Sequence, residues 1–394
     1  MHVVVLGAGY AGLTAVRTLE RTLPESVDIT VVDERDTHLV AHLLHRVVRK
    51  PALAEQIAVP VEACCRRATL RQARVLDVDA DEGVATLDDG TLEYDVGIVS
   101  LGARTAFYDL PGLESHATPL KRLDDARQIR EEFLDVLDTG GRTVVGGAGL
   151  SGVQVAGELA ELANESDDES DAVEGTGTDT GTGTDTSTVE VVLLEAESTV
   201  APGFPQPFQD AIAEEPTERG VDVRTETVVE SADKNHVTLA GGEEISYDQF
   251  VWTGGIAGQE ALSGSRPQVR STLRLGRKTF GVGDGVRVVD DRGTPVPASA
   301  QTATRQAKVA AQNVESLLEH AHDGGGFEPR LERYTYNSLG WVVTIGDGTV
   351  AQVGSRVLRG TPARALKTTI GVQHLASVGA VEDAIEFAQD AFIS

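Results

Sequence analysis

Two glycine-rich segments carry the residues whose types and spacing point most directly to chemistry. The first is Gly7-Ala8-Gly9-Tyr10-Ala11-Gly12, and the second runs from Gly147 to Gly152. In a G-x-G-x-x-G segment the first glycine permits a tight turn, the second lets the backbone approach a diphosphate, and the third lets a helix pack closely on a strand. The following helix offers free N–H groups and a positive dipole end. Each segment is therefore a candidate site for the diphosphate of a dinucleotide.

An acidic residue follows each segment near the distance at which a carboxylate can bind ribose hydroxyls. Asp33 lies 21 positions after Gly12, close to the ~20 expected. Glu195 lies 43 positions after Gly152, but residues 164–188 intervene, and this 25-residue tract of mostly Asp, Glu, Gly, Ser and Thr is almost free of apolar residues. Because such a tract cannot bury a core, we expect a solvated, salt-tolerant loop there rather than a partner-binding segment. Without the insert the second spacing is 18.

The elements that must position these residues occur twice along the chain. Residues 2–33 and 143–195 each predict a strand, a turn, a helix and a second strand. Residues 85–102 and 237–255 each predict antiparallel strands that return to a strand ending in glycine. The matched repeats predict an α/β fold: two Rossmann-like domains with βββ meander crossovers, plus a small C-terminal region.

A third candidate site follows a predicted strand at residues 278–283. Asp284 comes directly after this strand, and a helix is expected to begin near Ala300. A carboxylate placed there can hold polyol hydroxyls of a long cofactor, and the helix N-terminus can face a flavin ring, where negative charge develops on reduction. The alternative is that Asp284 is an ordinary turn or cap residue.

These residues together resemble a known family. The chain resembles the two-dinucleotide-domain flavoprotein oxidoreductases, most closely the type II NADH dehydrogenases, over nearly its whole length to about residue 345. The segments that carry the resemblance are Gly7–Gly12 with Asp33 and His38, Leu43-Leu44, 94–102, 110–114, Gly147–Gly152, 157–159, 251–255, Gly283-Asp284 and 300–303.

The resemblance implies a domain layout and two cofactors. It implies an FAD-binding domain formed by residues 1–112 and 272–330, and an NADH-binding domain at 113–271 that contains the acidic insert 164–188. Residues 331–394 are left as a docking or oligomerisation region. The implied FAD residues are Gly7, Gly9, Tyr10, Ala11, Gly12, Asp33, Glu34, His38, Val75, Gly102, Gly283, Asp284, Ala300 and Gln301. The implied NADH residues are Gly147, Gly149, Leu150, Ser151, Gly152, Glu195 and Gly255.

The implied reaction passes a hydride from NADH to FAD and then two electrons to a quinone. Because the cofactors carry this chemistry, we expect no side-chain nucleophile; Glu158 and Gln154 are placed near the flavin–nicotinamide site. Glu195 favours NADH, since a carboxylate repels the 2′-phosphate of NADPH.

Two departures from the family pattern concern the quinone. Gln154 stands where the family carries a glutamate, and Arg305 replaces a glutamine on the quinone side, next to Gln301. The alternatives are a soluble NAD(P)H-dependent reductase of a small electron-transfer protein and a flavin-binding redox sensor without turnover.

The composition of the chain limits the classes of partner that it can bind. The chain of 394 residues has 62 acidic and 34 basic residues and a net charge of -28, which argues against binding a nucleic-acid backbone. With 6 lysines against 28 arginines, the surface is typical of a protein adapted to high salt. We interpret Cys64 and Cys65 as idle thiols, and His42 and His45 as ordinary helix-face residues rather than metal ligands.

The last part of the chain breaks the acidic pattern. Residues 348–381 contain no Asp or Glu but include four cations, Arg356, Arg359, Arg364 and Lys367. Apolar residues lie between these cations, a pattern that predicts docking on an anionic membrane surface. The alternative is packing against the acidic body of the protein or a partner subunit, as in a homodimer. With no leader segment and no run of 18 apolar residues, we expect a cytoplasmic protein, with peripheral attachment to the inner face of the cell membrane.

Overall fold

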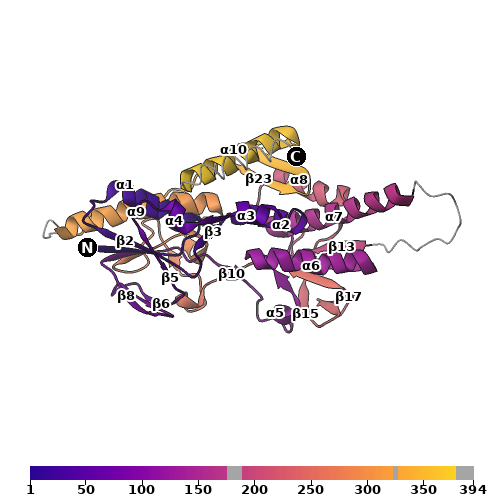
Figure 1. Cartoon of the computed structure of the whole chain (residues 1–394), viewed down its shortest axis with the longest axis horizontal. Coiled ribbons are helices and arrows are strands. Elements are labelled where there is room, and N and C mark those ends of the chain that lie inside the picture. The colour runs from indigo at the N-terminus through magenta and orange to yellow at the C-terminus, as the bar shows by residue number, and fades with distance from the viewer. Residues whose placement is uncertain (175–188, 323–326, 379–394) are drawn as a thin grey trace.

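The computed structural model describes residues 1–174, 189–322 and 327–378, which form two lobes side by side (Figure 1). The first lobe is built on a parallel five-stranded sheet with the strand order β21-β9-β1-β2-β5. Its strands are β1 (His2–Leu6), β2 (Asp28–Asp33), β5 (Thr69–Gln72), β9 (Val96–Val99) and β21 (Thr279–Gly281).

The apolar run in β1 explains the layers of this lobe. Val3 and Val5 pack with the helices α1 (Tyr10–Thr22) and α9 (Ala300–His322), whereas Val4 and Leu6 pack with the meander on the other face. A strand covered on both faces is expected to be apolar throughout, rather than alternating. The meander consists of β6 (Val75–Asp79), β7 (Val84–Leu87) and β8 (Gly90–Glu93).

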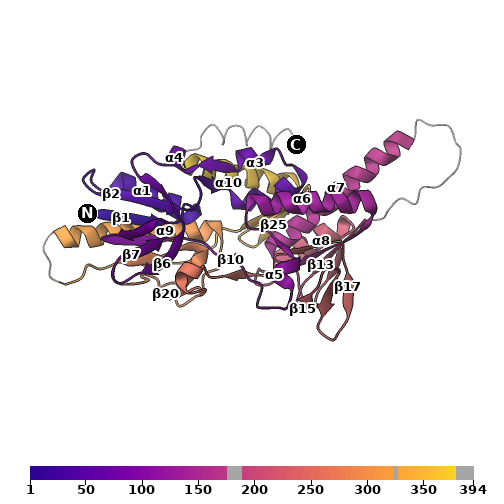
Figure 2. The same ribbon diagram turned by 60° about the horizontal axis from the view of Figure 1, so that its bottom comes forward.

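The second lobe repeats the first. Its parallel sheet has the strand order β11-β18-β12-β13-β14, and its meander is the antiparallel sheet β15-β16-β17. These strands are β11 (Thr118–Pro119), β12 (Gly141–Gly146), β13 (Val189–Leu194), β14 (Asp222–Arg224), β15 (Val229–Ala232), β16 (His236–Leu239), β17 (Glu244–Ser246) and β18 (Gln249–Trp252). Its helices are α6 (Leu123–Thr139), α7 (Leu150–Glu174) and α8 (Gln206–Glu218). The two meanders lie on the same lower side of the molecule (Figure 2). The predicted fold class is confirmed.

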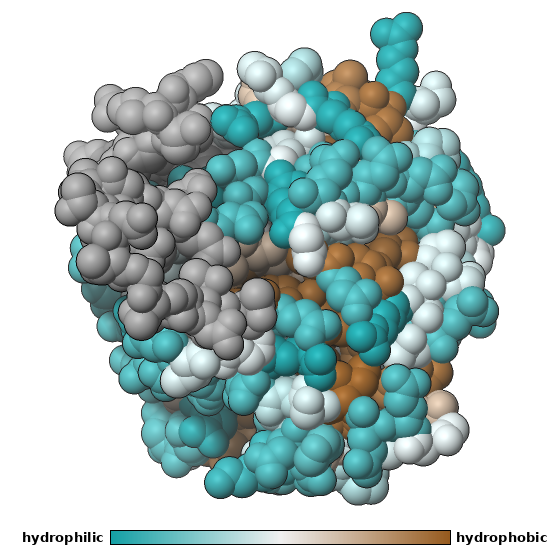
Figure 3. All heavy atoms as spheres, turned by 90° about the vertical axis from the view of Figure 1, so that its right-hand side faces the viewer, coloured by the Kyte–Doolittle hydropathy of each residue, from teal (hydrophilic) through white to brown (hydrophobic). Residues whose placement is uncertain are grey.

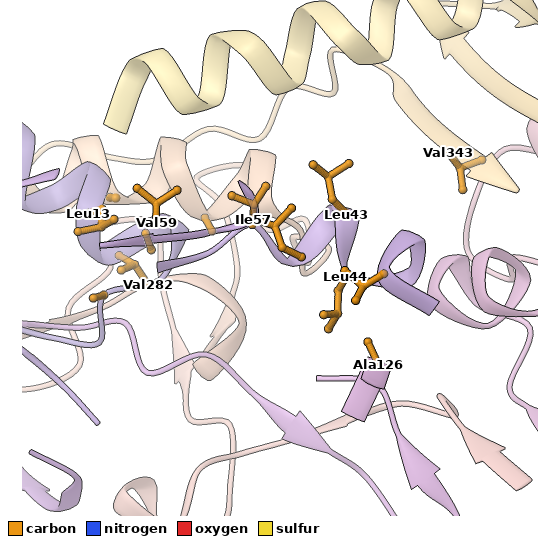
Figure 4. Packing of buried hydrophobic residues seen from close by; sticks show 14 of the residues in the cluster. Leu13, Leu43, Leu44, Ile57, Val59, Ala126, Val282 and Val343 are labelled. Carbon is orange, nitrogen blue, oxygen red and sulfur yellow. The ribbon is translucent and has the colours of Figure 1, made fainter. Parts of the chain in front are cut away.

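Two connections join the lobes. The first is a short antiparallel pair, β10 (Arg104–Thr105) with β19 (Ile256–Ala257). The second is the segment after β2, which consists of β3 (Thr37–Leu39), η1 (Ala41–Leu43), α2 (Leu44–Arg49), α3 (Leu53–Gln56), β4 (Ala58–Pro60) and α4 (Val61–Cys64). Its helix α2 packs on α6 and α7 of the second lobe. Figure 4 shows Leu43 and Leu44 from this segment between the first lobe and Ala126 of α6, so one apolar core crosses the junction.

The C-terminal region forms an antiparallel sheet and a helix against this junction. The elements are β23 (Trp341–Ile345), β24 (Gly348–Val353), β25 (Arg356–Arg359) and α10 (Thr361–Val378). Gly157 of α7 allows β23 to approach, since a Cβ at this position would lie 2.5 Å from Cγ2 of Ile345. The remaining short elements are α5 (Leu113–His116), β20 (Gln268–Val269), β22 (Arg287–Val288), η2 (Glu260–Leu262) and η3 (Gly283–Gly285).

The prediction of a loop from residue 164 onward is wrong for its first part. Helix α7 continues to Glu174, and only residues 175–188 of the insert lie outside the described structure. The physical reason is that residues 158–174 contain neither glycine nor proline, whereas glycines recur from Gly175. Acidic and small residues lower hydrophobicity without breaking a helix.

Candidate functional site: two matched nucleotide cradles

The two glycine-rich turns have the same geometry. Gly7 and Gly147, the first glycines, have φ values of +102° and +92°, which favour glycine. The middle glycines, Gly9 and Gly149, have no atom within 4 Å of the place where a Cβ would stand. The backbone at these two positions is therefore open to a ligand, as a diphosphate-binding turn requires.

The third glycines are held by packing inside the protein. A Cβ at Gly12 would lie 1.7 Å from the carbonyl oxygen of Gly7, and a Cβ at Gly152 would lie 1.8 Å from that of Gly147. Each helix therefore crosses its own turn too closely for any side chain. The roles expected for the three glycines are thus physically distinct in both repeats.

A hydroxyl residue supports each turn, which the sequence analysis missed. The Ser100 hydroxyl lies 2.9 Å from the Gly7 carbonyl oxygen and 3.0 Å from that of Leu6. The Thr253 hydroxyl lies 2.8 Å from the Gly147 carbonyl oxygen and 3.1 Å from that of Gly146. The signal was present in the sequence, because each hydroxyl residue follows the Tyr-Asp pair of its meander by the same spacing.

The two acidic residues also occupy matching positions. One carboxylate oxygen of Asp33 accepts a hydrogen bond from the Ala8 amide at 2.7 Å, and one of Glu195 accepts from the Ala148 amide at 2.7 Å. The second oxygens accept from the amides of Arg35 and Glu197, each at 3.0 Å. Burial raises the pKa of Asp33, and these two amide hydrogen bonds oppose that shift. Each carboxylate is thus held at the mouth of its turn.

The third predicted site brings several segments together. A Cβ at Gly283 would lie 3.5 Å from Cβ of Ala11 and 3.6 Å from Cβ of Ala303, so the start of α1, the start of α9 and the end of β21 meet there. The Gly283 amide donates to the Gln306 side chain at 2.8 Å. Close by in sequence, a Cβ at Gly285 would lie 2.9 Å from the Gly102 carbonyl oxygen.

Two buried oxygens at this third site have no hydrogen-bond partner within the described residues. They are Oδ1 of Asp284 and Oε1 of Gln301. Burial raises the pKa of Asp284, and the positive charges of Lys121 and Arg266 oppose the shift. Buried polar atoms are nearly always satisfied, so these two acceptors fit a ligand that brings hydroxyl or N–H donors. The residues present therefore fit a flavin dinucleotide.

The remaining residues expected to bind the cofactors lie on several elements. Leu150 and Ser151 lie in the first turn of α7, and Ala300 begins α9. Val75 begins β6, and Gly255 lies against Tyr108, whose hydroxyl donates to the Gly254 carbonyl at 2.9 Å.

An open depression lies beside the end of β2. It is lined by Glu34, Arg35, Gln72, Ala73, Arg74, Asp88 and Arg122. Arg122 reaches across from the second lobe and lies 3.1 Å from the Glu34 carboxylate. Because Glu34 directly follows Asp33, this depression is where the adenosine end of a nucleotide bound to the first turn would lie.

Two aromatic residues next to the first turn, Tyr10 and His38, make hydrogen-bond contacts. The Tyr10 hydroxyl lies 2.5 Å from Nδ1 of His42, and Nδ1 of His38 lies 3.0 Å from the Ala8 carbonyl oxygen. Burial lowers the pKa of His38 to about 4 and raises the pKa of Tyr10. Both side chains are therefore neutral near pH 7, and His38 contacts the backbone of the turn itself.

Comparison with known proteins agrees with this geometry. The sequence pattern of the pyridine nucleotide-disulphide oxidoreductases matches residues 1–307. The chain belongs to this family. It is 25% identical to a type II NADH:quinone oxidoreductase of Staphylococcus aureus, over 96% of each chain.

Solved structures similar to this pyridine nucleotide-disulphide oxidoreductase share its fold. NDH2 from Plasmodium falciparum in complex with NADH superposes with a TM-score of 0.79 at 16% identity, covering 99% of this chain and 98% of that one. The sulfide:quinone oxidoreductase from Aquifex aeolicus gives a TM-score of 0.74 at 17% identity, covering 96% and 91%.

The disulphide chemistry in the family name has no counterpart in this member. Neither Cys64 nor Cys65 is in a disulphide bond, and Cys64 is fully buried. Burial raises the pKa of the Cys65 thiol to about 12, so it is not a thiolate at neutral pH. Among the described residues, no group of His, Cys, Asp and Glu is arranged to hold a metal ion.

Glu158 is the centre of an ion-pair network between the lobes. It is fully buried on α7, and its carboxylate lies 2.8 Å from the Arg49 guanidinium of α2. Arg49 also reaches Glu165 at 2.9 Å and Asp347, in the turn after β23, at 2.5 Å. Burial raises the pKa of Glu158, and Arg49 opposes this shift. The network ties both lobes to the C-terminal region.

The interpretation of His45 as an ordinary helix-face residue is wrong. His45 is buried where three segments meet: its Nε2 lies 3.1 Å from the Gln154 side chain and 3.1 Å from the Thr344 hydroxyl. Burial lowers the pKa of His45, and the nearby cations Lys367 and Arg46 lower it further. Gln154, expected near the flavin–nicotinamide site, is thus in contact with a neutral histidine from the first lobe.

The cations of residues 348–381 do not all lie on an open surface. Lys367 is buried and donates to the Thr344 hydroxyl, and Arg359 pairs with Glu214 at 2.6 Å. Arg305, expected on the quinone side, donates to the Asn337 carbonyl at 2.5 Å. Among the helices in the described ranges, none is both long enough and apolar enough to cross a bilayer.

Proposed function

We propose that this chain is an NADH:quinone oxidoreductase that holds FAD in the first lobe and NADH in the second. The observation that carries the proposal is the repeated cradle: the same open glycine, the same carboxylate-to-amide contact and the same supporting hydroxyl occur in both lobes. Two nucleotide cradles in one chain fit a reaction in which one nucleotide transfers electrons to another. The full-length similarity to a type II NADH:quinone oxidoreductase supports the choice of cofactors and acceptor.

Each cofactor would be held by residues with separate tasks. In the first lobe, the N-terminus of α1 would bind the diphosphate, Asp33 the ribose, and Asp284 with Gln301 the polar groups nearer the flavin. When bound, FAD supplies the acceptance of hydride and its release as electrons to a quinone. The protein orients the two nucleotides and provides no nucleophile.

The second lobe selects the nicotinamide nucleotide. Glu195 is buried at the mouth of the turn, with both carboxylate oxygens on backbone amides. A carboxylate fixed there repels a 2′-phosphate, whereas it can accept a hydrogen bond from a ribose hydroxyl. We therefore propose a preference for NADH over NADPH.

The quinone side would be formed near the start of α9. Gln301 presents a buried oxygen that lacks a partner among the described residues, while Arg305, one turn later, is anchored by the Asn337 carbonyl. The anchoring keeps the guanidinium on the segment before β23. Arg305, at the family's glutamine position, therefore leaves the side-chain oxygen of Gln301 available to a ligand.

Attachment to a membrane surface would be weaker than the net charge of residues 348–381 indicates. Lys367 is buried and Arg359 is paired with Glu214, which leaves Arg356 and Arg364 as exposed cations with no carboxylate partner among the described residues. On α10, Ile370 is 43% exposed. On the end face formed by the second lobe, hydrophobic residues are interspersed with hydrophilic ones (Figure 3). We propose reversible, peripheral docking on anionic lipid; the cytoplasmic location and a homodimer remain predictions.

Vesicle flotation tests this docking. With vesicles of phosphatidylglycerol and phosphatidylcholine, Arg356→Glu combined with Ile370→Gln should lower the bound fraction, because it replaces a positive charge by a negative one and removes an apolar contact. Arg127→Glu, on the exposed face of α6, serves as the charge-matched control. Equal binding by both variants would count against this surface.

The proposed reaction is tested on the protein purified in molar salt. We expect the visible absorbance of oxidised flavin, its bleaching by NADH, and steady NADH oxidation when a soluble quinone analogue is added. A ferredoxin-type acceptor is offered in parallel, because it would separate the reductase alternative. Bleaching without turnover on any acceptor would favour a redox sensor, and the absence of flavin would overturn the proposal.

A further inference from the structure

A small pocket in the C-terminal junction gathers positive charge that the proposed reaction does not use. We name it the cationic pocket and define it by six of its lining residues, Arg46, Lys50, Asp347, Thr349, Arg364 and Lys367. Its residues come from three segments: the end of α2, the β23–β24 hairpin and the first turns of α10. All three meet beside the Arg49–Glu158 network, but none of the pocket residues belongs to either nucleotide cradle.

The charge of the pocket is not balanced from within the protein. Across the described residues, none of the four cations lies within 4.0 Å of an Asp or Glu carboxylate. Asp347, the pocket's own carboxylate, is already bonded to Arg49. Arg219, by contrast, is paired with Glu161 at 2.6 Å. Lys367 and Arg364 donate hydrogen bonds to the Thr344 hydroxyl and the Asp347 carbonyl. In a chain of net charge -28, however, four clustered cations with no carboxylate partner among the described residues need a separate explanation.

The pKa shifts of the two lysines show that these cations repel one another. Burial lowers the pKa of Lys367 to about 7, and the Arg46 charge adds to that shift. Burial also lowers the pKa of Lys50, with further contributions from Arg46 and Arg49. The carboxylates that act on these two lysines, Glu158 and Asp347, oppose the shifts without cancelling them. An anion in the pocket would relieve this repulsion.

Two hydrogen-bonding groups in the pocket lining are also unsatisfied within the described residues. Nε of Arg46 is buried without an acceptor, and the Thr349 hydroxyl, on a residue 1% exposed, has no partner. Buried donors without acceptors cost free energy, so such groups usually mark a bound water or ion. Here both donors line a space that is otherwise ringed by cations.

The size of the pocket limits what can fill it. Its cavity volume is about 40 Å³, on a scale where one water needs about 10–15 Å³. The space therefore suits a compact group of a few heavy atoms and is too small for a whole nucleotide. A tetrahedral oxyanion meets both the charge and the number of donors.

We propose that the cationic pocket binds a phosphate-type oxyanion, held by Arg46, Lys50, Arg364 and the Thr349 hydroxyl. Such an anion would bridge α2, the β23–β24 hairpin and α10, and would fix the C-terminal region against the junction of the lobes. The shared chemistry is a phosphate group, which can come from free inorganic phosphate or from the headgroup of an anionic lipid.

Equilibrium dialysis with labelled inorganic phosphate tests the proposal on the full chain. The protein carries its FAD and is saturated with NAD+, so that both cradles are filled, and the salt is held at molar KCl. We expect one saturable site. Lys50→Gln and Arg46→Gln should each weaken it about tenfold or more, because each removes a charge-assisted hydrogen bond. Lys308→Gln, a change at an exposed lysine on α9, is the matched control and should leave binding unchanged.

Competition distinguishes the two sources of phosphate. Vesicles of phosphatidylglycerol that displace the labelled phosphate would assign the site to a lipid headgroup, and the lack of displacement would assign it to the free anion. No saturable binding, or binding unaffected by both pocket variants, would overturn the proposal. Lys50 is half-buried at the end of α2, so Lys50→Gln keeps the test valid if Arg46→Gln fails to fold.

Discussion

Replacing Arg49 should destabilise the junction between the lobes, because its guanidinium makes the 2.8 Å ion pair with Glu158, while Arg46 and Lys367 act on that carboxylate from farther away. In Arg49→Met, three carboxylates lose their partner at once. Asp347 and Glu165 have side chains that are 62% and 52% exposed, so water can replace the guanidinium around them. Glu158 is 0% exposed and has no such replacement, and its Oε1 already lacks a hydrogen-bond partner within the described residues.

The expected loss follows from this asymmetry. Removing one member of a buried ion pair costs about 3–5 kcal/mol, because it leaves a buried charge without compensation. Exposed pairs contribute about 0–1 kcal/mol each, and molar salt screens them further. We therefore expect Arg49→Met to lower the free energy of unfolding by about 3–5 kcal/mol, nearly all of it due to Glu158. Neutralising that group in Arg49→Met with Glu158→Gln should restore at least about 1 kcal/mol.

Urea unfolding in molar KCl, followed by tryptophan fluorescence, measures these differences. Arg127→Met breaks the exposed pair with Asp124 and serves as the control with no measurable change. A loss below about 1 kcal/mol for Arg49→Met would refute the reasoning, since that is the size of an exposed pair. A double variant no more stable than Arg49→Met would show that the charge of Glu158 is not the source of the loss.

Four further variants probe the second cradle, the third site and the pH dependence of stability. Gly149→Ala meets no atom within 4 Å and should leave the thermal midpoint of the protein unchanged while weakening NADH binding; Gly152→Ala meets a carbonyl oxygen at 1.8 Å and should lower both, as scanning calorimetry and NADH titration will show. Equal midpoints for these two variants would contradict the packing argument. Asp284→Ala removes an unsatisfied buried acceptor and should reduce FAD retention after gel filtration, and normal flavin content would count against its role. Because burial lowers the pKa of His38 from 6.5 to about 4, the unfolded chain binds the proton first, and stability should fall as the pH drops from 6.5 towards 4. His38→Asn should flatten that part of the pH profile, and an unchanged slope would exclude the residue as its source.

The cradles could be predicted from the sequence because their determinants are local. Gly7 and Gly12 are five residues apart. Gly7 is required by its backbone conformation and Gly12 by the close approach of the helix to the turn, and the spacing of the motif predicts both. Ser100 could have been found by the same repeat, since Thr253 holds the corresponding position. By contrast, Arg49 meets Asp347 across 298 positions, and no spacing rule connects them. Tertiary packing of α2 on the second lobe decides that contact.

Residue composition alone does not predict where charged residues lie in the folded chain. The acidic tract after Asn164 was interpreted as a loop from its polarity, although helix α7 tolerates that polarity up to Glu174. For the cations after Gly348 the sequence leaves membrane docking and packing against the acidic body both open, and the fold buries Lys367 and pairs Arg359 with Glu214. In both cases the count of charges was correct. Where these charges lie in the structure depends on how far a helix continues and on how strands pair, and a count of charges predicts neither.

The distribution of charge also explains how an acidic protein can hold two lobes together in salt. At molar ionic strength the screening length is about 3 Å, so an exposed pair such as Arg122–Glu34 contributes little to the contact between the lobes. Ions cannot enter the space around Glu158, so its attraction to Arg49 persists. Nearby, the charge of Arg46 repels the buried Lys367. A junction that relies on the attraction at Glu158 therefore also carries this repulsion, and a bound oxyanion in the cationic pocket would neutralise it at the point where α2, the hairpin and α10 meet.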